Sequence, residues 1–142
     1  MNRLYVGALC SAVAFAASLF AQPLFAKDEK AAKGRVFELR IYTANEGRTE
    51  AMHKRFRDHT CALFQKHGME LIGFWVPQDP KDKNKLYYIL AYPSREAAKE
   101  SWKAFSADPE WQRVYKESHK DGVIVGKVES VFMESTDYGP LK

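Results

Sequence analysis

The alternation of apolar and polar side chains is clearest near residue 40. There the stretch FELRIY places three apolar residues between three polar ones, in the order Phe37, Glu38, Leu39, Arg40, Ile41 and Tyr42. A period of two is typical of a β-strand with one apolar and one polar face. The pattern predicts a strand over residues 35–43. The polar face of this strand carries an acid, a base and a phenol. Whether these groups meet water or are buried therefore matters for function.

Later segments alternate between helical and strand patterns. Apolar spacing and turn signals predict helices over 48–66, 95–105 and 109–119, and strands over 70–76, 86–92 and 123–134. In the first helix the apolar stripe is Met52, Phe56, His59 and Leu63. Asp108-Pro109-Glu110 is a strong helix start, because Asp caps free amides and Pro suits the first helical position.

The element order is β-α-β-β-α-β, with the second helical region split in two. This order predicts an α+β, ferredoxin-like fold, in which helices cover one face of a four-stranded antiparallel sheet. The strand at 86–92 is apolar on both faces, with Leu86, Tyr88, Leu90 and Tyr92 on one and Tyr87, Ile89 and Ala91 on the other. Such sheets are covered on both sides. We therefore expect a homodimer through the sheet face, forming a dimeric α/β barrel.

The N-terminal segment has a different composition from the rest of the chain. After Arg3 no charged residue occurs until Lys27. A basic start followed by an apolar run predicts a signal peptide over residues 1–26, cleaved after Ala26, with Ala16 and Ala21 as alternative sites. The prediction is a secreted or periplasmic protein. The alternative is an uncleaved segment that anchors the chain to the membrane. Residues 27–34 then form a flexible lead-in, 35–136 the domain and 137–142 a tail.

Charge and cysteine content narrow the function classes. The 142 residues include 22 basic and 18 acidic residues, mixed along the chain, for a net charge of +4. No basic block is present, so we expect no nucleic-acid partner. The segment after residue 26 contains one cysteine, Cys61, and no Gly-rich phosphate loop. Four scattered histidines give no metal-site spacing. We expect no metal and no cofactor, with haem kept as an alternative.

Several short motifs resemble the NIPSNAP family. They are FELRIY, the turn with Gly47, GFW at 73–75 and DPEWQ at 108–112. The resemblance covers about Val36 to Met133. It implies the dimeric α/β-barrel superfamily, which also holds cofactor-independent oxygenases, lactone isomerases, haem-degrading enzymes and binding modules. The family has no agreed catalytic set, so the resemblance assigns no residue a role.

Three groups of residues are candidates for chemistry. Glu38, Arg40 and Tyr42 are expected to point away from the helices, into the dimer interior. There Glu38 and Arg40 form an interface network, or Arg40 anchors a carboxylate or enolate oxygen while Tyr42 donates a hydrogen bond. His59 is expected in the core facing the sheet, or as a general base or haem ligand. Trp75, Tyr87 and Tyr88 are core residues, or they line a pocket for a small apolar or aromatic ligand.

These observations leave two hypotheses for function. The first is an exported, homodimeric NIPSNAP-like module that binds a small molecule or a partner. The second is a small cofactor-independent oxygenase or isomerase, or a haem-binding enzyme, with His59 as base or ligand and Arg40 and Tyr42 beside the substrate. The catalytic candidates are single residues and form no larger set of catalytic groups. This favours the first hypothesis.

Overall fold

A computed structural model describes residues 34–141, and the predicted leader at 1–26 lies outside the described residues. The elements follow the predicted order. They are β1 (Val36–Ala44), α2 (Thr49–Arg55), the π-helical turn η1 (Phe56–Thr60), α3 (Cys61–Lys66), β2 (Glu70–Trp75), the 3-10 turn η2 (Pro80–Asp82), β3 (Lys85–Tyr92), α4 (Arg95–Ala107), α5 (Pro109–Ser118) and β4 (Val125–Glu134). The predicted α+β, ferredoxin-like arrangement is confirmed.

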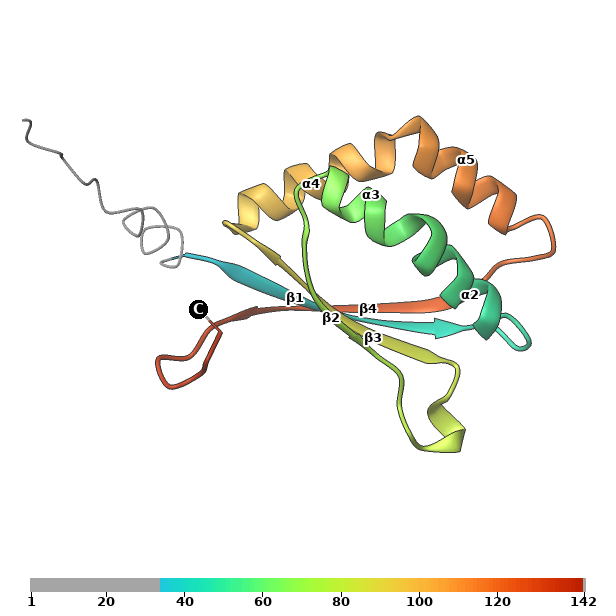
Figure 1. Ribbon diagram of the computed structural model, residues 1–142, viewed down its shortest axis with the longest axis horizontal. Helices are drawn as coiled ribbons and strands as arrows, with labels where there is room; N and C mark the ends of the chain where they lie inside the picture. Colours follow the sequence, from blue (N-terminus) through green and yellow to red (C-terminus); the bar gives the residue numbers. More distant parts are fainter. Residues whose placement is uncertain (1–33, 142) are drawn as a thin grey trace, which may run out of the picture.

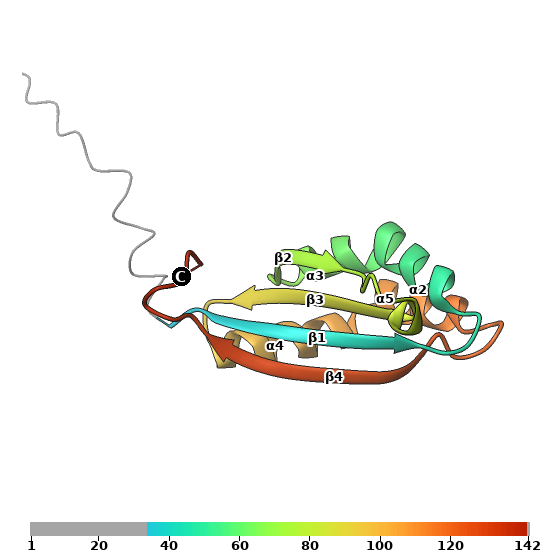
Figure 2. The ribbon, with the colours of Figure 1, turned by 90° about the horizontal axis from the view of Figure 1, so that it is seen from below.

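The four strands form one antiparallel sheet in the order β2-β3-β1-β4. The helices α2, α3, α4 and α5 lie on one face of it, as Figures 1 and 2 show. Within residues 34–141 no helix is long and apolar enough to span a membrane. The chain therefore builds two layers, a helical layer and a sheet whose second face has no cover from its own helices.

The core lies between these two layers and is rich in aromatic rings. From β3, Tyr88, Leu90 and Tyr92 are fully buried. The rings of Phe56 and Phe64 lie 5.3 and 6.0 Å from the Tyr88 ring. These contacts confirm that the predicted face of this strand, with residues 86, 88, 90 and 92, faces the core.

The first helix contains a π-helical turn that its sequence pattern did not reveal. The amide of Cys61 donates to the carbonyl of Phe56, an i to i+5 bond that inserts one extra residue. Each residue advances an α-helix by about 100°, so the side chains after the insertion change direction. Thr60 is buried, whereas His59 is half-buried and away from the sheet. The prediction that His59 faces the sheet was wrong, and Cys61 packs partly against the core.

Asp108 starts α5 as its sequence predicted. One carboxylate oxygen accepts from the amide of Glu110 at 2.8 Å, and the other lies 2.6 Å from Nε2 of His67 and 2.8 Å from Nζ of Lys66. Hydrogen bonds from Lys66, His67 and the Glu110 amide hold the pKa of Asp108 well below its usual range. A single carboxylate therefore joins the end of α3 to the start of α5.

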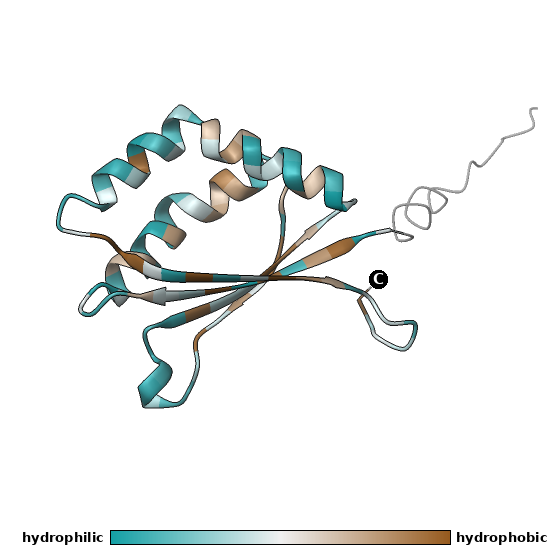
Figure 3. Cartoon of the chain, turned by 180° about the vertical axis from the view of Figure 1, so that it is seen from behind, coloured by the Kyte–Doolittle hydropathy of each residue, from teal (hydrophilic) through white to brown (hydrophobic). Residues whose placement is uncertain are grey.

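The face of the sheet away from the helices carries a row of apolar side chains across its strands. Leu39 on β1 pairs with Ile89 on β3 and Val131 on β4, so these three side chains share that face. Trp75 and Val131 remain 51% and 53% exposed. Figure 3 shows hydrophobic stretches along the strands. In the FELRIY part of β1 the polar residues thus face the helices and the apolar residues face outward.

Candidate functional site

A buried carboxylate lies at the centre of the cluster on the helix-facing side of β1. Glu38 is 1% exposed and accepts four side-chain hydrogen bonds. Oε2 accepts from the hydroxyl of Tyr92 at 2.8 Å and from the indole of Trp102 at 2.7 Å. Oε1 accepts from Ser130 at 2.6 Å and from Arg40 at 2.6 Å. The donors come from β1, β3, β4 and α4, so Glu38 ties the outer strand and a helix to the sheet.

The four donors decide the charge of Glu38. Burial alone would raise its pKa, but hydrogen bonds from Ser130, Trp102 and Tyr92 and the charge of Arg40 outweigh it, and the pKa is lowered. Glu38 is therefore ionised at neutral pH. Because its oxygens are already occupied, it can hold Arg40 but has little capacity to take a proton from a ligand.

Arg40 is held on three sides. Its Nε donates to the hydroxyl of Tyr88 at 3.0 Å, and Nη2 lies 3.5 Å from the hydroxyl of Tyr42. The guanidinium lies 4.2 Å from the centre of the Trp102 ring, a cation–π contact. Burial lowers its pKa, but Tyr88, Tyr42 and Glu38 outweigh burial and raise it above its usual value. The Arg40 side chain keeps 15% of its surface exposed.

This geometry corrects the expectation for β1. Glu38, Arg40 and Tyr42 point toward the helices, and the Glu38–Arg40 network connects elements of one chain, so it is no interface network. The sequence could not show the direction, because alternation separates two faces without saying which one the helices cover. Burial of the polar face is stabilised by the aromatic hydroxyls, the indole and the serine that surround the charges.

A cleft of about 490 Å³ opens beside this cluster, between α4 and β4. It is lined by Arg95, Glu96, Lys99, Trp102 and Phe132. Trp102 belongs to both the cluster and the cleft. On the same face of β4, Val128 is 47% exposed and Ser130 is exposed, because the helices leave the outer strand partly uncovered. The charged cluster therefore adjoins an open, partly aromatic cleft.

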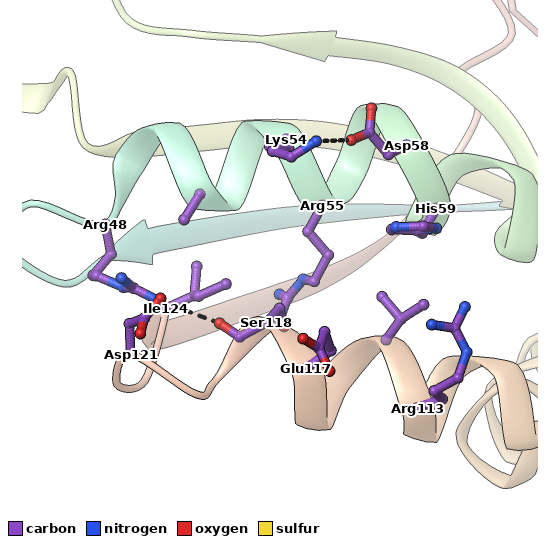
Figure 4. Close-up of a pocket in the computed structure, with 12 residues that line it drawn as sticks. Arg48, Lys54, Arg55, Asp58, His59, Arg113, Glu117, Ser118, Asp121 and Ile124 are labelled. Atoms are coloured by element: carbon purple, nitrogen blue, oxygen red, sulfur yellow. Dashed lines mark hydrogen bonds and ion pairs between the residues drawn. The ribbon is translucent and has the colours of Figure 1, made fainter.

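His59 lies in a different place. It lines a groove of about 300 Å³ between the α2–η1 helix and α5. Figure 4 shows its ring at one end of this groove, with Arg113 on the facing helix. The groove shares no lining residue with the α4–β4 cleft. The structure thus brings Arg40 and Tyr42 together but does not join His59 to them.

The three aromatic residues proposed for one pocket are divided between the two faces of the sheet. Trp75 and Tyr87 are cross-strand partners on the outward face. Tyr88 is buried in the core, where its hydroxyl accepts from Arg40. The expected pocket of Trp75, Tyr87 and Tyr88 was therefore wrong, since neighbouring residues of a strand point to opposite sides.

The sequence analysis did not predict three of the partners of Glu38, namely Tyr92, Trp102 and Ser130. A signal existed for Tyr92, which has the same parity in β3 as Tyr88. Trp102 carried only a general aromatic signal. Ser130 had none, because its position depends on the register that places it opposite Arg40.

A comparison of the sequence with protein-family models identifies the family of this chain. The NIPSNAP family model matches residues 37–140, which include all four strands except the first residue of β1. The chain belongs to the NIPSNAP family. No curated protein matches the chain significantly.

Solved structures agree on the fold. A NIPSNAP family protein of unknown function from Agrobacterium tumefaciens is 23% identical, with 77% of this chain and 95% of that chain covered and a TM-score of 0.67. A NIPSNAP-like domain protein from Burkholderia xenovorans is 18% identical over 76% and 91% of the chains, with a TM-score of 0.65. SnoaB, a cofactor-independent oxygenase from Streptomyces nogalater, is 13% identical over 75% and 98%, with a TM-score of 0.51. At these identities the likeness concerns the fold alone.

Proposed function

We propose that this NIPSNAP protein is a homodimeric binding module that takes a small aromatic ligand in the cleft between α4 and β4. The observation that supports it is the Arg40 guanidinium, which is held by Glu38 and stacked 4.2 Å from the ring of Trp102, a residue that lines that cleft. Such fixed, partly exposed donors next to an aromatic wall are typical of small-molecule sites.

The charge balance of the cluster indicates the polar group of the ligand. Glu38 already neutralises Arg40, so a second full negative charge would gain little there. The neutral oxygen of a carbonyl group fits better, because it needs a hydrogen-bond donor and no counter-ion. The ring of such a ligand would lie against Trp102 and Phe132, both of which line the cleft.

The dimer is the second part of the proposal. The outward face carries Leu39, Ile89 and Val131 together with Trp75, an apolar surface that a monomer would leave in water. A second copy of the same face would bury it around a two-fold axis. The pattern of the FELRIY part of β1 supports this, because its apolar side chains are the ones that lack cover from the helices.

Catalysis with His59 as base has no supporting observation. It requires the imidazole and Arg40 in one cleft, whereas His59 lines the groove at α5. Glu38 is occupied by four donors and is a poor substitute base. Binding is therefore the function that the cluster supports best, and the proposal needs no cofactor.

Export completes the proposal. Residues 1–26 have the pattern of a cleaved leader, and the matched family domain begins after it, at residue 37. An intact-mass measurement on protein isolated from its host would report the new N-terminus. A chain that retains Met1 or another residue before Ala16 contradicts cleavage at the expected sites.

Native mass spectrometry of protein purified from its host tests the binding function. The expected spectrum shows a dimer with a retained small molecule, and Trp102→Ala removes the adduct while the dimer remains. Arg57→Gln, an exposed change on the first helix, is the control and should retain the adduct. Absence of any adduct, or equal retention by Trp102→Ala, would overturn the assignment of the cleft.

A further inference from the structure

We propose that the groove between the α2–η1 helix and α5 is a second binding site, in which Arg55 holds the carboxylate of a small organic acid. This site goes beyond the ligand cleft at α4 and β4 and shares none of its lining residues. Figure 4 shows Arg55 reaching from the first helix across the groove toward Ser118 on α5.

Arg55 is a buried cation without an acidic partner. It is 5% exposed, and its Nη1 donates to Oγ of Ser118 at 3.3 Å. Nε is buried and has no hydrogen-bond partner. Within the described part of the chain no carboxylate forms an ion pair with Arg55. Buried charges are normally paired, because an isolated one loses its hydration without replacement.

Arg40, which is largely buried, shows what an arginine with a full set of partners looks like. Arg40 has a carboxylate at 2.6 Å, and a phenol at 3.0 Å. Arg55 has ring neighbours, with Trp111 and Tyr115 at 5.3 and 6.0 Å, but nothing that takes the place of Glu38. Burial lowers the pKa of Arg55, and the phenols of Tyr42, Tyr115 and Tyr88 offset this only in part. An anion would compensate this charge.

The rest of the groove is also basic. Arg48 donates from Nη2 to the carbonyls of Ser118 and Gly122, each at 3.3 Å, and its buried Nε has no partner. Arg113 adds positive charge to the lining.

The acidic residues of the lining are Asp58, Glu117 and Asp121. Asp58 and Glu117 are already engaged in ion pairs, with Lys54 and Lys120. Basic charge thus exceeds what the acidic side chains of the groove can neutralise.

Size and lining indicate the class of ligand. The groove has a volume of about 300 Å³, and Ala51, Val114 and Ile124 form an apolar part of its wall. A planar carboxylate matches the fork of a guanidinium with two parallel hydrogen bonds. A small acid with a short apolar body, such as an aromatic carboxylate, therefore suits the groove.

Isothermal titration of the purified full-length protein with benzoate tests this site at low ionic strength. We expect saturable binding of one benzoate per chain. Arg55→Met should weaken it at least tenfold, about 1.4 kcal/mol, since a charge-assisted hydrogen bond contributes that much or more. Arg57→Gln, two residues and about half a turn further along the same helix and exposed, should bind within twofold of the wild type. Uncharged benzamide should not bind.

A second readout separates binding from folding. Arg55→Met keeps the apolar stem and removes an uncompensated charge, so its melting temperature without ligand should match or exceed that of the wild type. Arg55→Lys keeps the charge but loses the fork, and should show intermediate affinity. Absence of saturable benzoate binding, equal affinity in Arg55→Met, or inorganic phosphate binding as tightly as benzoate would each overturn the assignment of a carboxylate site.

Discussion

At the scale of single residues, Glu38 is the residue on which the charged cluster depends. Its carboxylate accepts from four side chains on four different elements, and it is the acidic partner of Arg40. Replacing it changes the hydrogen bonding of all four donors at once. The effect on stability should therefore exceed that of an ordinary surface charge.

Glu38→Gln should lower the free energy of unfolding by about 3–5 kcal/mol, because it leaves Arg40 buried without a counter-charge. Urea unfolding followed by tryptophan fluorescence measures the change. Glu117→Gln is the control: Glu117 is exposed and pairs with Lys120, so we expect a change below about 1 kcal/mol. Equal effects of the two variants would show that the cluster does not stabilise the domain.

The same carboxylate predicts acid sensitivity. The folded-state pKa of Glu38 is lowered, so its contribution to stability is complete above the pKa of the unfolded chain. That contribution is lost as the pH falls through the lower, folded-state value. The pKa of Asp108 is also lowered in the folded protein, so this residue likewise makes the domain less stable in acid. Melting temperatures recorded from pH 7 downward should fall in the acid range, and Glu38→Gln should flatten that fall.

At the scale of elements, Gly73 and Trp75 determine the outward surface of β2. A Cβ at residue 73 would lie 2.5 Å from an atom of the Trp75 ring, so the indole lies over the glycine. This close approach explains why glycine and tryptophan are two apart in the GFW motif, since residues i and i+2 share a face. The motif shapes the apolar surface that we expect a second copy to cover.

Gly73→Ala should displace the Trp75 indole and weaken the dimer by tenfold or more. Sedimentation at a series of concentrations measures association, and tryptophan fluorescence follows the ring. Gly47→Ala is a comparison at a turn with φ of 68°, where nothing lies within 4 Å, so it should strain the backbone and leave association unchanged. Unaltered association in Gly73→Ala would mean that Trp75 lies outside the interface.

At the scale of the whole molecule, the open face of the sheet decides the assembly. The helices cover one side, and the other presents Leu39, Ile89 and Val131. A dimer through that face would create a barrel between the sheets and leave the α4–β4 cleft and the α5 groove on the helix sides. The two proposed ligand sites would then be independent of the interface.

Val131→Glu should convert the dimer to a monomer, because it places a charge in the apolar row that the dimer would bury. Val128→Glu is a matched control on the same strand. Val128 is also about half exposed but lies on the helix side, so the dimer should persist. Light scattering at micromolar concentration distinguishes the two. A monomeric wild-type protein under these conditions would contradict the dimer outright.

The sequence by itself determined the elements and their order. Period-two alternation, helical spacing and the Asp108 start signal are local, so each could be interpreted within a few residues of its position. The strand and helix bounds agree with the prediction to within two residues or so, and the order of the elements restricted the topology to the ferredoxin-like fold. The family motifs could be recognised in the sequence because they too are local.

Only the tertiary structure decided what each side chain meets. Alternation places Glu38, Arg40 and Tyr42 on one face but cannot say that this face lies under the helices. The extra residue in the π-helical turn directs Thr60 toward the core in place of His59. No local sequence pattern predicted this turn. Ser130 reaches Glu38 through strand register, and Arg55 reaches Ser118 across two helices. Sites depend on contacts between distant segments, and those contacts arise only when the layers pack.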